Sequence, residues 1–202
     1  RELMSTYTFL PKATLTQNHA FLTWDNAFSN EELDQIINVC DRLPVQKAVI
    51  SNATEADEFS DIRSSKIGWL PCTQESEWIY ERLSNVARNL NAQFYGFDLY
   101  GFVEHMQYTV YESDANGHYT WHTDLSDTSA SPRKFSLVLQ LSDPSEYEGG
   151  ELQTFTQPEP QVVDKKRGLI AAFPSWALHR VTPVTSGVRR TLVVWVAGPQ
   201  FK

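Results

Sequence analysis

The sequence predicts a mainly β fold with flanking helices, in which two helices pack on a jelly roll. From Phe97 onward, short runs typical of strands alternate with turn residues almost throughout. Helical spacing of apolar residues occurs in two segments, and both lie before residue 95. A length of 202 residues and a hydrophobic fraction of 41% suit a single domain with a buried core. We therefore expect one domain over 1–202, with a helix-containing support region over 1–95 and a jelly-roll core over 96–202.

The amino-terminal region predicts the first helix. Residues 1–27 alternate loosely and indicate a strand or an extended segment. Ser29 and Glu32 have the spacing of a capping box, and apolar residues at helical spacing follow them. We expect a helix from about residue 30 to 42, ended by Pro44. Cys40 lies on its apolar face and is expected in the core.

The segment between the helices predicts two short strands and a loop. Val45–Ile50 and Arg63–Leu70 are the expected strands, and Asn52–Asp61 reads as an exposed acidic loop. A second helix is expected over Glu75–Gln93, where one stripe is apolar and contains Trp78, Ile79, Leu83, Val86, Ala87 and Leu90.

Composition restricts the partners and the location. A net charge of −8, with few compact basic runs, among them Lys165–Arg167 and Arg189–Arg190, argues against nucleic acid as a partner. No apolar run approaches the roughly 18 residues of a membrane span, so no membrane association is expected. Cys40 and Cys72 do not suggest a disulfide framework, and a cytoplasmic location is the expectation. Because the chain starts at Arg1 without a Met, a trimmed leader stays open, as does the oligomeric state.

Three residues form a candidate metal site. The run Gly117–His122 is rich in aromatic residues and predicts a strand, on which residues two apart share a face. His122 and Asp124 could then hold one ion side by side, with His179 from a distant strand as the third ligand. Two histidines and one carboxylate are typical of non-haem Fe(II) oxygenases. Taken alone, His-x-Asp is a weak signal, and the alternatives are a surface His and a turn-capping Asp.

Five motifs in order resemble a known family. They are the His-x-Asp triplet at 122, Gln107-Tyr108-x-x-Tyr111, Leu141-Ser142-Asp143-Pro144, Tyr147-Glu148-Gly149-Gly150-Glu151-Leu152, and His-x-Val-x-Pro-Val-x-x-Gly-x-Arg from His179 to Arg189. The segment Phe97–Val196 thereby resembles the catalytic core of Fe(II)/2-oxoglutarate dioxygenases of the prolyl-4-hydroxylase type, and bacterial PKHD-type hydroxylases in particular. The resemblance implies a double-stranded β-helix, Fe(II), 2-oxoglutarate and O2, with ascorbate as an optional cofactor.

The resemblance also implies a set of co-substrate residues. The family places an Arg ten residues after the distal His, which is Arg189, and its planar fork could bind the 2-oxoglutarate C5 carboxylate bidentately. Thr191 shares its strand face and could donate a hydroxyl hydrogen bond, whereas Arg190 points the other way. Tyr111 and Tyr119 are further co-substrate candidates, with a purely structural core position as the alternative. Some relatives have a further Tyr on the strand that matches residues 135–141, and in this chain that contact is either missing or supplied by Gln140.

The resemblance implies hydroxylation of an unactivated C–H bond, with His122, Asp124 and His179 at the catalytic centre. A prolyl residue in a peptide or protein is the first substrate expectation, and a free amino acid or other small molecule is the second. A non-catalytic, cupin-like metal-binding jelly roll is the rival from another class, and Arg189 speaks against it. Two polar segments, Asn52–Arg63 and Asp124–Pro132, are the candidates for closing the site.

Overall fold

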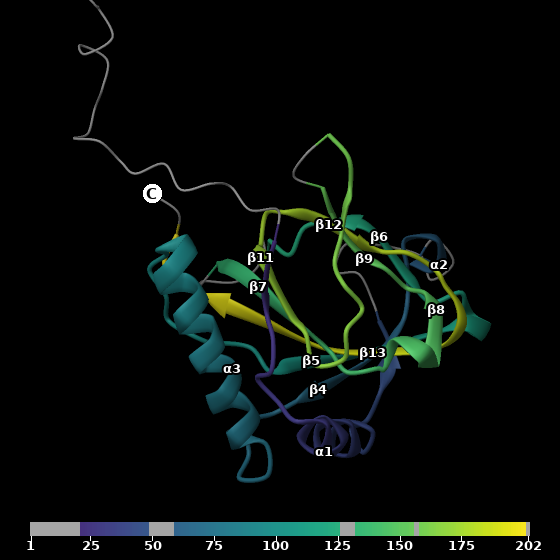
Figure 1. The fold of residues 1–202 in the computed structure, drawn as a ribbon, viewed down its shortest axis with the longest axis horizontal. Helices are drawn as coiled ribbons and strands as arrows, with labels where there is room; N and C mark the ends of the chain where they lie inside the picture. The colour runs from purple at the N-terminus through teal and green to yellow at the C-terminus, as the bar shows by residue number, and fades with distance from the viewer. Residues whose placement is uncertain (1–20, 49–58, 126–131, 156–157, 201–202) are drawn as a thin grey trace, which may run out of the picture.

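Two antiparallel β-sheets form the centre of the molecule, and the two longer helices lie against the larger sheet (Figure 1). The computed structural model describes residues 21–48, 59–125, 132–155 and 158–200. The larger sheet has the order β1 (Leu22–Trp24), β11 (Ile170–Pro174), β7 (Arg133–Gln140), β13 (Val184–Ala197), β5 (Met106–Glu112), β4 (Lys66–Leu70) and β2 (Gln46–Lys47), and β8 (Tyr147–Gly149) also pairs with β13. The smaller sheet has the order β10 (Gln161–Val162), β9 (Leu152–Phe155), β12 (Leu178–Val181), β6 (His118–His122) and β3 (Arg63–Ser64). The predicted jelly roll with flanking helices is confirmed.

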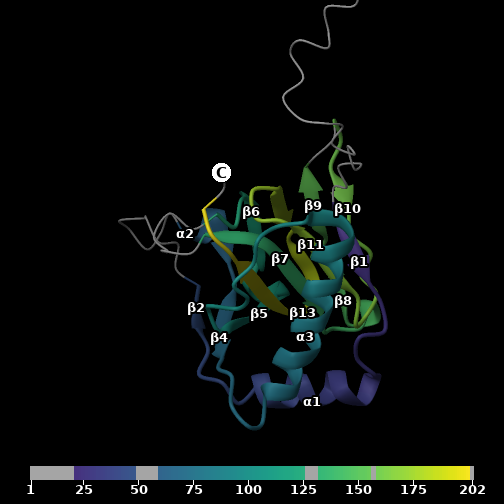
Figure 2. The ribbon, with the colours of Figure 1, turned by 90° about the vertical axis from the view of Figure 1, so that its left-hand side faces the viewer.

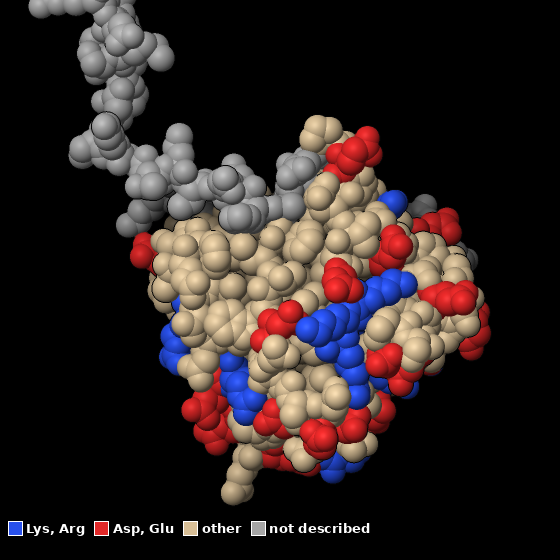
Figure 3. Space-filling view, in the orientation of Figure 1, with Lys and Arg blue, Asp and Glu red and all other residues tan. Residues whose placement is uncertain are grey.

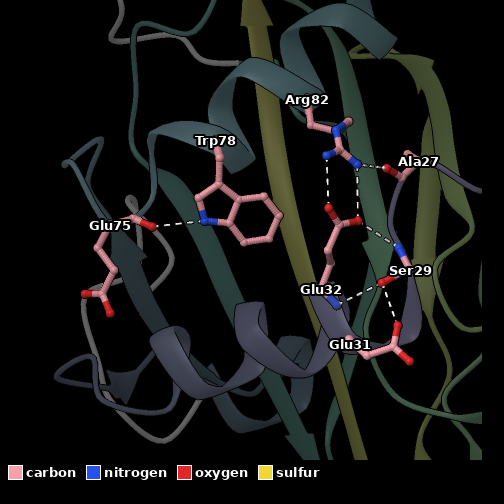
Figure 4. A network of polar contacts seen from close by, with 7 residues as sticks. All are labelled: Ala27, Ser29, Glu31, Glu32, Glu75, Trp78 and Arg82. Atoms are coloured by element: carbon pink, nitrogen blue, oxygen red, sulfur yellow. Dashed lines mark hydrogen bonds and ion pairs between the residues drawn. The ribbon is translucent and has the colours of Figure 1, made fainter.

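The first helix, α1 (Asn30–Cys40), begins at the predicted capping box. The Ser29 hydroxyl accepts a hydrogen bond from the Glu32 N–H at 3.2 Å, and the Glu32 carboxylate accepts one from the Ser29 N–H at 2.8 Å. Figure 4 shows that Glu32 also accepts two hydrogen bonds from Arg82 of α3 (Glu77–Leu90), at 3.0 and 3.2 Å. A cap of this kind stabilises a helix by roughly 0.5–2 kcal/mol, and here it also joins the two helices. Cys40 is fully buried, as expected.

The second predicted helix is confirmed as α3, although its limits differ from Glu75–Gln93. It starts at Glu77, because the preceding residues form a turn in which the Ser76 hydroxyl donates to the Pro71 carbonyl at 2.6 Å. Beyond Leu90 the chain continues as one π-helical turn, Asn91–Tyr95, which Gly96 ends in a left-handed conformation with φ 64°. Five members of the predicted stripe are buried, namely Ile79, Leu83, Val86, Ala87 and Leu90.

The predicted strand Arg63–Leu70 is interrupted at Ser65. Its first part, β3, pairs with β6 in the smaller sheet, whereas β4 pairs with β5 in the larger sheet. The segment therefore crosses from one sheet to the other, a change that hydrophobic alternation alone does not encode. β1 and β2 also join the larger sheet, so the region over 1–95 contributes strands to both sheets. Its separation from a core over 96–202 stays a prediction.

Other expectations for the amino-terminal part can be compared with the structure only where its residues are described. Of the expected strand Val45–Ile50, the pairing is limited to Gln46–Lys47, and residues 49 and 50 lie outside the described residues. Most of the predicted loop Asn52–Asp61 also lies outside them. For the last part of this segment the prediction of a loop is wrong, because α2 (Phe59–Ile62) begins there. The strand expected within residues 1–27 is present at Leu22–Trp24.

The larger sheet separates two hydrophobic cores. Leu192 and Val194 of β13 belong to the core beneath α1 and α3. In Figure 2, α3 lies in front of the strands and α1 lies below them. Val138 of β7 and Phe173 of β11 belong to a second core, which lies between the two sheets. Because residues on a strand alternate between faces, this arrangement assigns Arg189 and Thr191 to the space between the sheets. That space is called the barrel interior below.

Gly149 and Gly150 form a tight turn before β9, with φ 70° and 58°. At Gly149 the Cβ of any other residue would lie 2.1 Å from the Pro183 carbonyl oxygen, so the requirement for glycine is both conformational and steric. At Gly150 the Cβ would lie 3.0 Å from the Arg189 Cδ. The turn therefore leaves room for the Arg189 side chain.

The surface carries both signs of charge. Figure 3 shows Lys and Arg side chains lying among Asp and Glu on one face. Of the basic run Lys165–Arg167, Lys166 contacts Asp25 at 3.0 Å and Arg167 contacts Asp34 at 2.5 Å. Among the described residues, no helix is long and apolar enough to cross a membrane.

Candidate metal centre and co-substrate site

His122, Asp124 and His179 lie together at one end of the barrel interior. His122 is the last residue of β6 and is paired directly with His179 of β12. One ligand atom of each residue lies within 4.8 Å of the others. The Asp124 carboxylate is 3.8 Å from His122 Nε2 and 3.6 Å from His179 Nε2. The predicted trio is therefore brought together around one point.

The position of Asp124 differs from the prediction. β6 ends at His122, so the expectation that both residues lie on the strand is wrong. Asp124 is held by other contacts: its N–H donates to the Ser175 carbonyl at 2.8 Å, and the Ser136 hydroxyl donates to its Oδ2 at 2.6 Å. These bonds turn the carboxylate towards both imidazoles without strand pairing.

Backbone carbonyls fix the orientation of both imidazoles. His122 Nδ1 lies 2.8 Å from the Thr120 carbonyl oxygen, and His179 Nδ1 lies 2.9 Å from that of Ala177. A carbonyl only accepts, so each Nδ1 carries the proton and donates it. Nε2 then keeps its lone pair on the side of Asp124, which is the form that binds a metal.

The ionisation of the trio suits a divalent cation. Burial, followed by the neighbouring His179, lowers the pKa of His122 to about 3, so this imidazole is neutral at neutral pH. Burial would raise the pKa of Asp124, but the two histidines and the Ser136 hydroxyl together outweigh that effect and lower it. The indole N–H of Trp195 has no hydrogen-bond partner of ordinary length, yet it lies close enough to help lower the pKa of Asp124.

Arg189 is fully buried in the barrel interior and incompletely paired. Its Nη2 donates to the Gln140 side-chain oxygen at 3.1 Å, and its Nε has no hydrogen-bond partner. The guanidinium carbon lies 5.4 Å from the centre of the Tyr111 ring. No ion pair of Arg189 with a carboxylate occurs within the part of the chain that the structure describes. A buried cation in this state is costly unless an anion binds it.

The neighbouring Arg190 points to the other face of β13, as strand parity predicts. It is half-buried, its Nε lies 3.9 Å from the Asp41 carboxylate, and Asp41 also accepts a hydrogen bond from the Tyr108 hydroxyl at 2.5 Å. Arg190 therefore belongs to the helix side of the sheet. The two arginines occupy different environments although they are adjacent in sequence.

The other predicted co-substrate residues lie near Arg189 or near the metal ligands. Thr191 and Tyr111 are buried, and cross-strand pairing places them on the face of Arg189. Tyr119 instead stacks on His122, with ring centres 3.4 Å apart and planes 14° apart. Burial raises the pKa of Tyr119, so its hydroxyl stays protonated at neutral pH. Their roles at the co-substrate stay predictions.

Two further interior residues, Thr154 and Tyr147, were not predicted as site residues, although Tyr147 belongs to one of the five motifs. Thr154 of β9 is paired with His179, so Thr154, His179 and His122 form one row across three strands. The Thr154 hydroxyl is fully buried and has no hydrogen-bond partner. Tyr147 is buried beside Arg189; burial raises its pKa, and the guanidinium counteracts part of that rise. The available signal was strand parity, because Thr154 alternates with the exposed Phe155.

The remaining histidines lie away from the trio where they are described. His118 Nδ1 contacts the Asn116 carbonyl at 2.7 Å, and its Nε2 contacts the Asp61 carbonyl at 3.1 Å. His105 is exposed, and His19 lies outside the described residues. Trp121 faces away from the metal ligands, because it packs edge-on against the exposed Phe155.

The donor set fits the metal and co-substrate that the sequence implies. Two neutral imidazole nitrogens and one carboxylate are the ligands of the facial triad, which leaves neighbouring positions of an octahedral ion open. The partnerless Arg189 Nε and Thr154 hydroxyl lie in the same barrel interior. Buried donors without partners indicate that a polar molecule completes this interior.

Comparisons with known proteins agree with this geometry. The family model of the 2OG-Fe(II) oxygenase superfamily matches residues 106–197. A PKHD-type hydroxylase of Azoarcus sp. strain BH72 is 31% identical over 173 residues, which cover 83% of this chain and 74% of that protein. The chain belongs to the 2OG-Fe(II) oxygenase superfamily. Another relative, a PKHD-type hydroxylase of Synechococcus sp. strain CC9311, is 34% identical over 90 residues, and that match spans only 41% of the relative's length.

Solved structures of this superfamily share the fold. A Pseudomonas putida prolyl-4-hydroxylase superposes with a TM-score of 0.71 at 19% identity, covering 90% of this chain and 94% of that one. A Trichoplax adhaerens prolyl hydroxylase, solved in complex with a peptide fragment of a hypoxia-inducible factor, gives a TM-score of 0.71 at 16% identity, covering 88% and 83% of the two chains. Fe(II), 2-oxoglutarate and O2 are the metal and co-substrates of the superfamily, and in this chain His122, Asp124 and His179 form a group that could hold a metal ion.

Proposed function

We propose that this protein is a 2-oxoglutarate-dependent hydroxylase that binds Fe(II) through His122, Asp124 and His179. The observation that carries the proposal is one barrel interior that holds three converging metal ligands and a buried arginine whose Nε has no hydrogen-bond partner. A plain metal-binding barrel needs no buried cation. An oxygenase that uses a dicarboxylate co-substrate does.

The chain's own residues would prepare the site before any substrate arrives. The Thr120 and Ala177 carbonyls hold the imidazoles in the tautomer that presents Nε2. The Ser136 hydroxyl holds one oxygen of Asp124. A geometry fixed in this way avoids reorganisation when the cation binds.

Arg189 would anchor the far end of the co-substrate. Its guanidinium is held by Gln140 and lies beside the Tyr111 ring, so its orientation is set before binding. A C5 carboxylate would accept from the free Nε and neutralise the buried charge. Gln140 thereby takes a supporting role beside Arg189. When bound, Fe(II) and 2-oxoglutarate supply the oxidising chemistry that inserts one oxygen atom of O2 into a C–H bond, with succinate and CO2 as the other products.

The first substrate candidate is a prolyl residue in a peptide or protein. The support comes from relatives that carry the name PKHD-type hydroxylase and from the peptide seen with the Trichoplax adhaerens prolyl hydroxylase. A free amino acid or another small molecule is the second candidate. The two segments expected to close the site, Asn52–Arg63 and Asp124–Pro132, lie largely outside the described residues.

The test is reconstitution of the protein with Fe(II) under anaerobic conditions, followed by addition of 2-oxoglutarate, O2 and a proline-containing peptide library. We expect succinate to form and one library member to gain one oxygen atom by mass spectrometry. Formation of succinate without any modified peptide would support the proposed reaction class but would exclude these peptides as substrates. Absence of both products from metal-loaded protein would contradict the proposed function.

A further inference from the structure

Asp124 is the one metal ligand candidate that no strand holds, because β6 ends at His122. Its backbone is instead hydrogen-bonded on both sides of the Cα. The N–H donates to the Ser175 carbonyl at 2.8 Å, and the carbonyl accepts from Arg133 Nη1 at 3.3 Å. Arg133 therefore contacts the backbone of the carboxylate ligand directly.

Arg133 is itself fixed by two partners, Glu104 and Trp195. Its Nε and Nη2 donate to the two oxygens of Glu104, at 2.7 and 2.5 Å, in a bidentate pair. Its guanidinium lies over the Trp195 ring, 3.6 Å from the ring centre. Only Nη1 is left to bond Asp124, and the planar fork fixes where that nitrogen points.

Ser175 connects the same residues from the other side. Its hydroxyl donates to the Arg133 carbonyl at 2.6 Å, while its N–H donates to the Lys134 carbonyl at 3.0 Å. The carbonyl that receives the Asp124 N–H thus belongs to a residue anchored at the start of β7. The hydrogen bonds of the Asp124 N–H and of the Asp124 carbonyl therefore both depend on the first two residues of that strand.

We propose that Arg133, held by Glu104 and Trp195, is a positioning residue that sets the affinity of the site for its metal through the backbone of Asp124. The inference rests on the proposed role of His122, Asp124 and His179 as metal ligands. Arg133 touches neither the metal nor the co-substrate in this scheme. Loss of its bond frees the backbone carbonyl of Asp124, so the carboxylate is no longer preset towards the two imidazoles.

The test measures Co(II) binding rather than turnover, by titration of the metal-free protein with its visible absorption as the signal. Arg133→Gln should weaken Co(II) binding by roughly 10–100-fold, the usual loss for a partner of a metal ligand. Glu104→Gln should give a smaller loss, and Arg133→Lys should recover part of the affinity. At saturating metal, the apparent KM for 2-oxoglutarate should be unchanged, because Arg189 is untouched.

Arg180→Gln is the matched control. Arg180 also lies over a tryptophan, 4.5 Å from the Trp121 ring centre, and its Nε donates to Gln153 at 2.9 Å. It follows His179 in sequence but lies on the outer face of the smaller sheet with Trp121. Its removal should leave the Co(II) affinity and spectrum at the wild-type values.

Two outcomes would overturn the proposal: wild-type Co(II) affinity in the folded Arg133 and Glu104 variants, or an equal loss in Arg180→Gln. If Arg133→Gln does not fold, Arg133→Lys and Glu104→Gln carry the same test. Failure of the proposed function looks different, because alanine at His122 or His179 would then leave Co(II) binding intact. If Co(II) affinity falls in the His122 and His179 variants but not in the Arg133 and Glu104 variants, only the positioning role of Arg133 is excluded, and the metal ligands stand.

Discussion

The two walls of the barrel interior hold their functional residues by different means. The Arg189 wall consists of β5, β7 and β13 of the larger sheet, and the metal wall consists of β6, β9 and β12 of the smaller sheet. In the Arg189 wall, long strands keep an uninterrupted register around Tyr111, Arg189 and Thr191, and helices cover the outer face. In the metal wall, the strands are short, the register shifts after His179, and Phe155 and Leu178 are 43% and 37% exposed outside.

This difference shows what each half of the site needs. A single arginine must be buried and must point into the barrel interior. A regular strand achieves both, because its side chains alternate between the two faces of the sheet. Three ligands must meet at one point from different segments, which a strand alone cannot arrange. Side-chain and backbone hydrogen bonds from Ser136, Ser175 and Arg133 therefore complete the metal wall.

The largest effect is expected in the metal wall. Alanine at His122, Asp124 or His179 should each abolish stoichiometric Fe(II) binding and all turnover, since two ligands do not hold the ion. Anaerobic titration with Fe(II) and a succinate assay measure the two losses, and circular dichroism checks that the fold remains. Full iron affinity and activity in Asp124→Ala would show that the ligand assignment is wrong.

The next effect separates the two faces of β13. Arg189→Ala should raise the apparent KM for 2-oxoglutarate by orders of magnitude, because a desolvated carboxylate loses a charge-assisted fork that contributes several kcal/mol. Arg190→Ala is the matched control and should change that constant little, since Arg190 faces Asp41 on the helix side. Steady-state kinetics with varied 2-oxoglutarate gives both values. Equal effects from the two variants would refute the assignment of faces.

A moderate effect concerns pH. The pKa of His122 is lowered to about 3, while an unfolded histidine titrates near 6.5. Between these values the unfolded chain binds a proton that the folded protein does not, so the metal-free protein should lose stability as the pH falls from about 6.5 towards 3. His122 alone contributes at most about 1.4 kcal/mol per pH unit.

Urea unfolding of the metal-free protein at several pH values measures this dependence. His122→Gln removes the titrating group and should flatten the curve between pH 4 and 6.5, a range set by the folded and unfolded values. An unchanged slope in that variant would mean that His122 keeps an ordinary pKa in the folded protein.

The smallest effect concerns Thr154. Thr154→Val keeps the shape and removes a buried hydroxyl that has no partner, so the stability of the metal-free protein should stay the same or rise slightly. If the hydroxyl bonds the bound co-substrate beside His179, the apparent KM for 2-oxoglutarate should rise several-fold, which corresponds to roughly 1 kcal/mol. Thermal unfolding and steady-state kinetics test the two parts. A fall in stability with an unchanged constant would make Thr154 a structural residue.

Much of the fold could be predicted from local signals. The capping box at Ser29 and the stripe in α3 have causes within a few residues, and the strand alternation from Phe97 onward fixes the fold class. The break at Ser65 could not be predicted, because it depends on which sheet each half of the segment joins. The end of β6 before Asp124 could not be predicted from the local sequence either.

The candidate site also contains residues that could be predicted from the sequence and residues that could not. Arg189 and Arg190 were separable by parity alone, and the structure places them on opposite faces. Ser136 and Arg133 carry no motif and become visible only when β7 is placed beside Asp124. Their contacts join residues distant in sequence, which a spacing rule cannot detect.

One measurement tests most directly whether both walls form a single site. 2-Oxoglutarate is titrated anaerobically into protein loaded with Fe(II), and the charge-transfer absorption that develops when a 2-oxo acid chelates Fe(II) is recorded. We expect the band in the wild type, no band in His179→Ala, and a band in Arg189→Ala only at far higher 2-oxoglutarate. No band in the iron-loaded wild type, or identical titrations for wild type and Arg189→Ala, would contradict a site shared by the two walls.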